Sequence, residues 1–445
     1  MTDVEPNMVK RDVIVALSNI VGEEYVLTDP VDLACYAYDG TFEESRPDVV
    51  VLPASTDEVA RTVVIAACHG IPIITRGMGS GLAGASVPID GGMVLSLTRM
   101  NRILEIDQEN MTATAQAGVI TADLQEAVER VGLFYPPDPS SLKQSTLGGN
   151  AACCAGGPRC LKYGVTKDYV MGLEVVLANG EVLRTGGKTV KNVTGYDLTQ
   201  LFVGSEGTLG IITELTVRLL PKPKAKRTAT AIFPRLDDAS NAVNKILTAG
   251  VLPATLEIMD DTTIGTVEDY LHIGLPRTVE AILIIETDGD PQSAQREIET
   301  IAQICRENGA SDVRVAQTQA ESDELWRARR AVSPSLGRRR PNKLGEDIAV
   351  PRSAIPEMIR RIQDISRRHN LPIAVFGHAG DGNLHPNILF DRRDEDEMHH
   401  VEAATCEIFQ AAVELGGTLT GEHGVGTLKR DFLEMAVGSV AVQVM

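Results

Sequence analysis

The first part of the sequence alternates short apolar runs with amphipathic stretches, a pattern that predicts strands and helices in turn. Apolar periodicity predicts a helix over residues 8–21, and the apolar run 48–53 predicts a strand. Residues 56–68 again have helical spacing and are followed by Gly70, after which residues 71–75 predict a second strand. The protein is therefore expected to open with a βαβ-like unit.

The pattern changes at residues 220–224, where prolines and lysines cluster and predict a domain boundary. Beyond this point a helix is expected over residues 291–308, with Asp290 as its N-cap, between strands at 281–285 and 313–315. Such alternation predicts ferredoxin-like α/β layers. We therefore predict an α+β protein of two domains. Its expected parts are a first domain over residues 1–222, a cap domain over 223–420 and a C-terminal segment over 421–445.

Composition limits the kinds of partner. The protein has 445 residues, 61 acidic and 42 basic, with a net charge of -19 and only 4% aromatic residues. The electric field of this negative net charge repels nucleic acid and acidic membranes, so any site for an anion must supply its own positive charge. No apolar run reaches the ~18 residues of a membrane span, and the first 11 residues resemble no secretory signal. The expected location is cytoplasmic.

Seven cysteines, an odd number, are spaced for neither a disulfide framework nor a zinc finger. Cys153, Cys154 and Cys160 do lie close together in the sequence. We interpret them as small buried residues of a tight Gly/Ala loop, with a metal site as the alternative.

Glycine-rich loops dominate residues 76–210. Residues 79–84 read Gly-Ser-Gly-Leu-Ala-Gly, but Pro88 and the pair Gly91-Gly92 exclude the helix that a Rossmann dinucleotide site requires. The stretch 76–81 is instead expected to form a nest of backbone N–H groups around an anion. Similar stretches at 148–152 and 204–210 lie in the same domain as the run Pro136-Pro137-Asp138-Pro139. Together they predict a large phosphate-bearing cofactor that lies along the backbone.

These glycine and proline motifs resemble the vanillyl-alcohol-oxidase-type, or PCMH-type, FAD-binding domain in order and spacing. The motifs are Arg76-Gly77-x-Gly79-x-Gly81-Leu82, Pro137-x-Pro139, Gly148-Gly149-Asn150, Gly156-Gly157-Pro158-Arg159 with Tyr163-Gly164, and Gly204-Ser205-Glu206-Gly207-Thr208. The resemblance implies that the first loop cradles the FAD pyrophosphate and that the others line the flavin and adenosine. Some relatives attach FAD to a histidine of the first loop; Ser80 is present here, so non-covalent FAD is expected.

The FAD contacts that the resemblance implies fall into three groups. The first loop contributes Arg76, Gly77, Met78, Gly79, Ser80, Gly81 and Leu82. The middle segment contributes Pro137, Asp138, Pro139, Ser140, Thr146, Gly148, Gly149, Asn150, Gly156, Gly157, Tyr163 and Gly164. The last segment contributes Glu206, Gly207, Gly210, Ile211 and Ile212.

Two histidines near the C-terminus are placed symmetrically around Asp381-Gly382. If these two residues form a type I′ turn, His378 lies directly opposite His385, ~5 Å away at Cβ, so both can bind one divalent ion. The alternative is a turn with two incidental histidines. Glu422 and His423, flanked by glycines, favour the metal. If extended, their side chains point to opposite sides, one toward metal and one toward substrate.

A His₂-carboxylate set of His378, His385 and Glu422 has the open positions of a catalytic metal site. Zinc is the leading candidate, and manganese or iron(II) fits the same ligands. Positive groups for a substrate carboxylate are available at Arg329, on a predicted helix, and at Lys343, with Ser333 between them. Taken singly, each also fits a surface role.

With the FAD motifs, these residues resemble the family of glycolate oxidase flavin subunits, D-lactate dehydrogenases and D-2-hydroxyglutarate dehydrogenases over nearly the whole sequence. The resemblance implies that His378, His385 and Glu422 bind the metal and that His423 is the base. It further implies that Arg329, Ser333, Lys343 and Asn387 hold substrate oxygens, although the spacing from Arg329 to Lys343 is shifted by a residue. Relatives continue into a tail that returns to the flavin domain, and this sequence stops before it.

The expected function is therefore FAD- and metal-dependent oxidation of a small D-2-hydroxy acid, glycolate or D-lactate, to the 2-keto acid. One alternative is a D-lactate or D-2-hydroxyglutarate dehydrogenase that works without a second subunit; another is a non-catalytic flavin-binding subunit of an electron-transfer complex. No cysteine run for an iron–sulfur cluster is present. Electrons are thus expected to leave to an iron–sulfur or second flavin subunit, which could hold the protein at the inner membrane, or to another acceptor.

Overall fold

A computed structural model describes residues 9–445, which fold into two compact units. The first unit contains the residues up to Gly156, Val165–Lys222 and Glu422–Arg430. The second contains Gly157–Gly164, Pro223–Gly421 and Asp431–Met445. The predicted helix at 8–21 is α1, Arg11–Val21, and residue 8 of that prediction lies outside the described residues.

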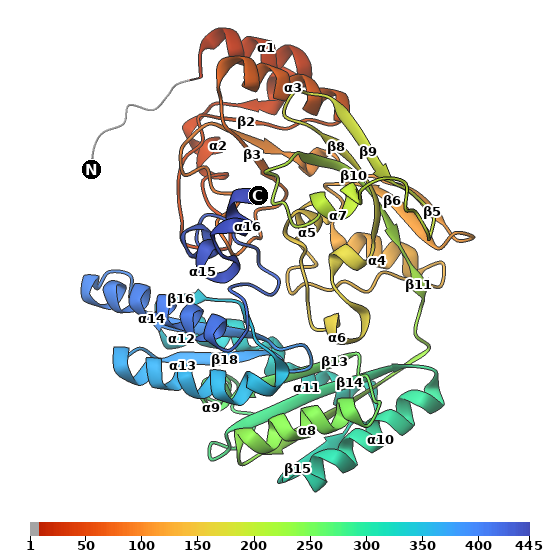
Figure 1. Cartoon of the computed structure of the whole chain (residues 1–445), viewed down its shortest axis with the longest axis vertical. Coiled ribbons are helices and arrows are strands. Elements are labelled where there is room, and N and C mark those ends of the chain that lie inside the picture. Colours follow the sequence, from red (N-terminus) through yellow and green to blue (C-terminus); the bar gives the residue numbers. More distant parts are fainter. Residues whose placement is uncertain (1–8) are drawn as a thin grey trace. The chain divides into compact units, whose positions relative to one another are not determined.

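The first unit, whose strands β2 and β3 and helix α3 are labelled in Figure 1, begins with a four-stranded sheet in the order β1-β2-β4-β3. Strands β2 and β3 both run parallel to β4, and helix α3 connects them, which confirms the βαβ-like opening. Helix α3 ends at Gly70, whose φ of 64° allows a left-handed cap. The elements are β1 (Val26–Leu27), α2 (Pro30–Ala34), β2 (Val49–Val51), α3 (Thr56–His69), β3 (Ile73–Arg76) and β4 (Met93–Ser96).

A five-stranded antiparallel sheet in the order β5-β6-β10-β8-β9 completes the first unit, with a two-stranded pair β7-β11. Buried apolar residues fill β8 and β10, so these strands carry its core. The strands are β5 (Ile103–Asp107), β6 (Thr112–Gln116), β7 (Leu133–Phe134), β8 (Val170–Val176), β9 (Val182–Gly186), β10 (Ile211–Arg218) and β11 (Leu220–Pro221). The helices are α4 (Thr121–Glu129), α5 (Leu147–Cys153) and α7 (Leu198–Phe202).

The second unit is built on an eight-stranded sheet whose main path runs β15-β12-β14-β13-β18-β19-β16, with β17 pairing to β19. Its first four strands are antiparallel and have the 4-1-3-2 order of a ferredoxin-like fold, so that prediction is confirmed. These strands are β12 (Ala225–Phe233), β13 (Thr255–Asp260), β14 (Ala281–Gly289) and β15 (Asp312–Val315). The added strands are β16 (Asn342–Gly345), β17 (Ile348–Ala349), β18 (Ile373–His378) and β19 (Asn383–Phe390).

Helices cover both faces of this sheet. On one face, α9, α11 and α12 pack an apolar cluster against Met259, Ile282 and Ile284. Helix α10 begins after the N-cap Asp290, as predicted, and buries Ala294 and Ile298. The helices are α6 (Cys160–Tyr163), α8 (Leu236–Thr248), α9 (Asp261–Leu271), α10 (Pro291–Glu307), α11 (Gln319–Arg330), α12 (Val332–Arg339), α13 (Ile355–His369), α14 (Glu395–Glu414), α15 (Leu433–Val437) and α16 (Ser439–Val444).

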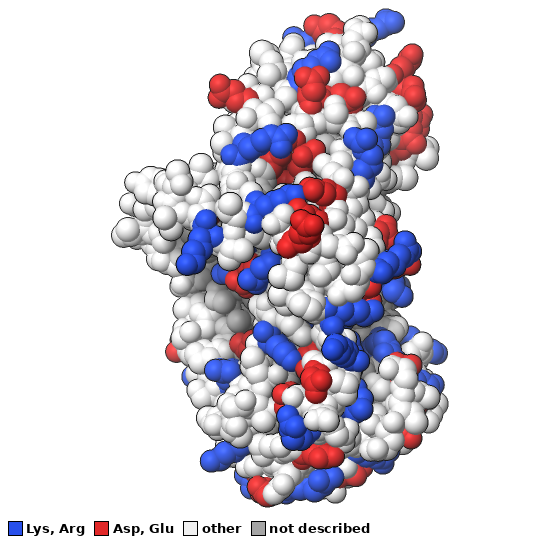
Figure 2. All heavy atoms as spheres, turned by 90° about the vertical axis from the view of Figure 1, so that its right-hand side faces the viewer, with Lys and Arg blue, Asp and Glu red and all other residues white. Residues whose placement is uncertain are grey.

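Acidic and basic side chains are interspersed over the face that Figure 2 presents. Among the helices of residues 9–445, none has both the length and the apolar character needed to cross a membrane.

Candidate active site and cofactor loops

The strand register of the second unit's sheet places the polar residues of the candidate active site on one face. Directly paired residues share a face, and so do alternate residues along a strand. Glu257 pairs with His378, His378 with Asn383, and Ala374 with Asn387. Ala374 belongs to the apolar cluster under α9, α11 and α12, so this polar row continues the face that those helices cover.

The predicted turn around Asp381-Gly382 is wrong in its register. His378 pairs with Asn383, and His385 pairs with Phe376, so the loop has four residues, Ala379–Gly382. A type I′ turn needs positive φ at both central residues, but here only Gly382, at 89°, has it. The loop is closed instead by the carbonyl of His378, which accepts the Gly382 N–H at 3.0 Å.

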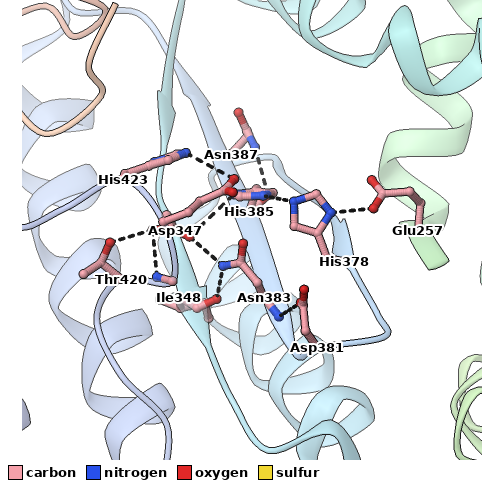
Figure 3. A network of polar contacts seen from close by, with 12 residues as sticks. Glu257, Asp347, Ile348, His378, Asp381, Asn383, His385, Asn387, Thr420 and His423 are labelled. Atoms are coloured by element: carbon pink, nitrogen blue, oxygen red, sulfur yellow. Dashed lines mark hydrogen bonds and ion pairs between the residues drawn. The ribbon is translucent and has the colours of Figure 1, made fainter. Parts of the chain in front are cut away.

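The two histidines nevertheless converge, because a register shift of two residues keeps a side chain on the same face. Their Nε2 atoms are 3.5 Å apart and their ring centroids 5.2 Å apart (Figure 3). Two imidazole nitrogens that bind one tetrahedral ion at ~2.0–2.1 Å lie roughly 3.3 Å from each other. Both side chains are buried, so the pair has the spacing and the environment of metal ligands.

Each histidine has a carboxylate on the Nδ1 side of its ring. His378 Nδ1 is hydrogen-bonded to Glu257, and His385 Nδ1 lies 3.8 Å from an oxygen of Asp347 (Figure 3). A carboxylate at one ring nitrogen orients the ring and makes the other nitrogen a better metal ligand. Both Nε2 atoms are thereby directed to the same region.

Glu257 is fully buried in β13 and was not predicted from the sequence. Its second oxygen accepts the Nε hydrogen of Arg329, a residue of α11, at 2.7 Å. Burial alone would raise the pKa of Glu257, but the charges and hydrogen bonds of His378 and Arg329 lower it to about 2. A single glutamate within the apolar run that forms strand Thr255–Asp260 was the sequence signal that could have indicated this buried carboxylate.

Asp347 is the centre of a second buried network that was also not predicted. Its oxygens accept hydrogen bonds from Asn383 Nδ2 at 2.6 Å, from Thr420 Oγ1 at 2.6 Å and from Gly421 N at 2.8 Å. These contacts fix the backbone immediately before Glu422 (Figure 3). The last residues of the second unit that precede Glu422 are therefore tied to the carboxylate beside His385.

The predicted substrate-binding residues of this unit lie on the same face. Lys343 on β16 pairs with Leu389 on β19, and Leu389 and Asn387 alternate with His385 along β19. Lys343 and Asn387 therefore lie on the same face of the sheet as the histidines. Lys343 Nζ donates to Ser333 Oγ at 2.6 Å, and burial lowers the pKa of Lys343. Asn387 Nδ2 donates to the carbonyl of His385 at 2.9 Å. Arg329, which also contacts Phe376, completes this group.

Glu422 and His423 belong to the segment Glu422–Arg430, which packs in the first unit. This segment is bent rather than extended. His423 Nε2 lies 4.0 Å from Glu422 Oε1, so the expectation that the two side chains point to opposite sides is wrong. Gly424 and Gly426, which follow, have φ values of 87° and 52°, a conformation that glycine adopts readily.

The first glycine loop has the properties expected of an anion nest. Within residues 9–445, no protein acceptor receives the amide N–H groups of residues 78–83. The Arg76 side chain packs against Gly79 of the loop and donates to the carbonyl of Tyr38 at 2.6 Å. A Cβ on Gly79 would be 2.1 Å from the Arg76 guanidinium, so this close approach requires glycine. No helix follows the loop, which agrees with the rejection of a Rossmann site.

The second glycine stretch is not a nest, contrary to prediction, because protein acceptors receive its amides. Gly148 N donates to Ala117, and Gly149 N donates to Thr146 Oγ1, the N-cap of α5. Close packing explains these glycines instead: a Cβ on Gly148 would lie 2.5 Å from the Ala117 side chain. In the third stretch Gly204 N donates to the carbonyl of Ala151, while no protein acceptor among residues 9–445 receives the amides of Gly207 and Leu209.

The three stretches still meet within the first unit. A Cβ on Gly77 would lie 2.3 Å from Thr146 Oγ1, which brings the first loop against the start of α5. Glu206 N donates to Ala152 at 2.8 Å, which attaches the third stretch to the same helix. Ile211 and Ile212 are buried on β10, and Gln125 donates to the Pro137 carbonyl at 2.7 Å. These contacts bring the three glycine-rich stretches together around α5.

Residues 157–164 leave the first unit, an excursion for which local sequence patterns contain no signal. Asp288 at the end of β14 accepts hydrogen bonds from Lys162 Nζ at 2.5 Å and Tyr163 OH at 2.7 Å. The side chain of Asp288 is buried, so this ion pair anchors the segment to the second unit. Gly157, Tyr163 and Gly164, three of the predicted FAD contacts, therefore belong to the second unit.

The clustered cysteines Cys153, Cys154 and Cys160 are half-buried rather than fully buried as predicted. Cys153 is the last residue of α5, and Cys154 caps that helix in a left-handed conformation. Burial raises the pKa of Cys153 to about 12 and also raises the pKa of Cys154. A raised pKa favours the thiol over the thiolate, which is the form that binds metals.

Comparison with known proteins agrees with this architecture. The family described as FAD binding domain matches residues 47–186, and the family described as FAD linked oxidases, C-terminal domain, matches residues 222–445. The protein has a TM-score of 0.80 with the crystal structure of p-cresol methylhydroxylase with substrate bound, at 18% identity, covering 99% of this chain and 94% of that one. That likeness confirms the two-domain fold.

Curated relatives are similar over nearly the whole sequence. The glycolate oxidase subunit GlcD of Bacillus subtilis is 50% identical over 98% of this chain and 93% of its own length. The GlcD of Escherichia coli strain K12 is 39% identical over 95% of this chain and 85% of its own length. A D-lactate dehydrogenase of Anaerostipes hadrus is 34% identical over 100% and 95%. The protein belongs to the FAD-linked oxidase family and is an FAD-binding oxidoreductase.

Proposed function

We propose that the protein oxidises a small D-2-hydroxy acid, glycolate or D-lactate, to the 2-keto acid with FAD and a divalent metal. The observation that carries this proposal is the 34–50% identity, over nearly the whole sequence, to proteins named for these two substrates. The polar face of the second unit's sheet supports it, because it offers metal ligands and cations for a carboxylate together.

His378 and His385 would hold the metal through Nε2, with Glu422 as the third ligand. The 3.5 Å spacing of the two nitrogens and the carboxylates at each Nδ1 support this role. Glu422 directly follows Gly421, whose amide is bonded to Asp347 beside His385. A bound divalent ion supplies Lewis acidity that favours ionisation of a hydroxyl. Zinc fits this ligand set best, and manganese or iron(II) fits it too.

The substrate carboxylate would bind to Arg329 and Lys343. Arg329 uses Nε for Glu257, which leaves its two terminal amino groups to bind a carboxylate. Lys343 and Ser333 are joined by a hydrogen bond that holds the ammonium group in place. Asn387 would contact a further substrate oxygen. The net charge of -19 repels an anionic substrate at long range, and the cations on this face provide positive charge where the substrate would bind.

His423 would take the proton of the 2-hydroxyl on an imidazole nitrogen, as a general base. FAD bound at the convergent loops of the first unit would supply the acceptor for the C2 hydride. The hydroxyl group loses its proton, its carbon loses the hydride, and the product is the 2-keto acid. We propose that FAD is held non-covalently, because Ser80 stands in the first loop and no histidine lies there.

Electrons would leave the reduced protein to a partner subunit or another acceptor. The relatives named GlcD are described as subunits, and this sequence lacks a cysteine run for its own iron–sulfur cluster. We propose an iron–sulfur or second flavin subunit as the partner and the cytoplasm as the location.

A substrate panel tests the proposal. Protein with measured metal content is assayed on glycolate, D-lactate, L-lactate and D-2-hydroxyglutarate with a dye acceptor, and its FAD is sought in the filtrate after heat denaturation. We expect the highest kcat/KM with glycolate or D-lactate, a value roughly tenfold or more below it for L-lactate, and all FAD in the filtrate. Equal inactivity on all four acids would contradict the substrate class, and flavin retained on the denatured protein would contradict non-covalent binding.

A further inference from the structure

The segment Glu422–Arg430 carries the proposed metal ligand Glu422 and the proposed base His423, yet it has almost no regular structure of its own. Apart from a single 3-10 turn that begins at Arg430, it contains no helix or strand. Its position therefore depends on specific contacts with the rest of the first unit.

One side of this segment is bound by a single carboxylate. Glu206 Oε1 accepts the amide hydrogen of Val425 at 2.6 Å, and Oε2 accepts that of Gly426 at 2.7 Å. Hydrogen bonds to an ionised carboxylate are shorter and roughly twice as strong as neutral ones. Both oxygens of Glu206 thus hold consecutive amides of the turn that follows His423.

Glu206 is itself held rigidly. Its φ is 52°, a conformation that non-glycine residues rarely adopt. Its amide donates to Ala152 in α5 at 2.8 Å. A strained backbone persists only where its surroundings fix it, and such strain gathers at functional positions.

The other side of the segment is bound by the first glycine loop. The carbonyl of Ala83 accepts the amides of Thr427 at 3.0 Å and Leu428 at 3.2 Å. A Cβ on Gly424 would lie 2.5 Å from Glu206 Oε1, and a Cβ on Gly426 would lie 2.0 Å from the Ala83 carbonyl. Both glycines are therefore needed for this close fit between the first and third glycine stretches.

We propose that Glu206 is a positioning residue: its carboxylate fixes the turn 424–426 and thereby places His423 relative to the glycine loops that hold FAD. Family resemblance alone places Glu206 among the FAD contacts, but its carboxylate binds protein amides. This inference rests on the proposed function, because it gives His423 a task that depends on position.

The test compares Glu206→Gln, which keeps the size but replaces one acceptor oxygen with an NH₂ group, with Gly424→Ala, which pushes the turn away from an intact Glu206. The control is Glu181→Gln, a carboxylate-to-amide change at an exposed site of the same unit. Three quantities are measured on each protein: bound FAD, hydrogen exchange of a peptide covering residues 422–430, and kcat and KM per bound flavin.

We expect both variants to keep FAD and to exchange the amides of Val425 and Gly426 about tenfold faster, because each loses a charge-assisted hydrogen bond. Displacement of the base should lower kcat per flavin about 10- to 100-fold with KM changed less than about threefold. The control should behave as wild type. Faster exchange of these amides together with a lower kcat per flavin supports the positioning role.

Wild-type exchange and wild-type kcat in Glu206→Gln would overturn the inference. Loss of FAD with a normal kcat per remaining flavin would also overturn it, since Glu206 would then act on cofactor binding. If the wild-type protein oxidises no 2-hydroxy acid, the proposed function fails. The exchange of Val425 and Gly426 then still decides whether Glu206 holds the turn.

Discussion

Alanine at His378 or at His385 is expected to remove the divalent metal and the activity together, with turnover reduced at least about 100-fold. Loss of one Nε2 leaves two of the three proposed ligands, and even changes to the groups that orient a ligand cost about 10–100-fold in metal affinity or activity. FAD should remain bound, because the convergent glycine loops lie in the other unit. Metal content by elemental analysis and turnover with a dye acceptor are measured on the same preparation.

Two further variants make this experiment specific. His400→Ala removes an exposed histidine that is paired with His369 in the same unit, and it should retain both metal and turnover. Glu257→Gln keeps the ligands but removes the charge at His378 Nδ1, so it should weaken metal binding less than loss of a ligand does. Excess zinc or manganese should partly restore a single histidine variant. A His378→Ala protein with full metal and full turnover would exclude the metal site.

His423→Ala is expected to lower kcat by about 10²–10⁴-fold, the usual cost of losing a general base, while FAD and metal stay bound. The proposed metal ligands and the glycine loops are unchanged in this variant, so only proton removal from the substrate should fail. Stopped-flow reduction of the flavin by substrate measures that step without the electron acceptor.

The same His423→Ala protein should be reduced by dithionite at the wild-type rate, since a chemical reductant needs no base. Added imidazole should partly restore reduction by substrate, because it can take the proton in place of the missing side chain. Reduction by substrate within a few-fold of the wild-type rate would remove His423 from the role of base.

The sequence predicted those parts of the fold that local patterns specify. The 3.6-residue period and the cap Asp290 predicted α10, and the apolar runs predicted β2 and β14. Pro88 and the glycines after it correctly excluded a helix behind the first glycine loop. Each of these features depends on neighbours within a few residues, which a sequence states directly.

Features that depend on long-range partners were predicted less well. The hairpin register was wrong by two residues, since the Asp-Gly pair fits several loop lengths, but alternation still put His378 and His385 on one face. The second glycine stretch was taken for an anion nest, although Ala117 receives its amide. Glycine permits both arrangements, and only the fold shows which acceptor is near.

The most important residues that sequence reasoning missed are buried carboxylates. Glu257 lies in an apolar strand, and Asp347 precedes a short one. A buried carboxylate is costly unless it is paired, so each should have suggested a cationic or imidazole partner. The identity of that partner, His378 for Glu257, comes from strand pairing between residues far apart in the sequence.

A 2-hydroxy acid is expected to deliver a hydride to the bound flavin, and anaerobic mixing tests this transfer most directly. The protein is mixed with glycolate or D-lactate without oxygen or dye, and flavin absorbance is followed with substrates that carry hydrogen or deuterium at C2. We predict complete bleaching of the flavin, slower with deuterium, and formation of one 2-keto acid per flavin. A flavin that stays oxidised with both acids, in protein that dithionite reduces normally and that contains its metal, would contradict the account.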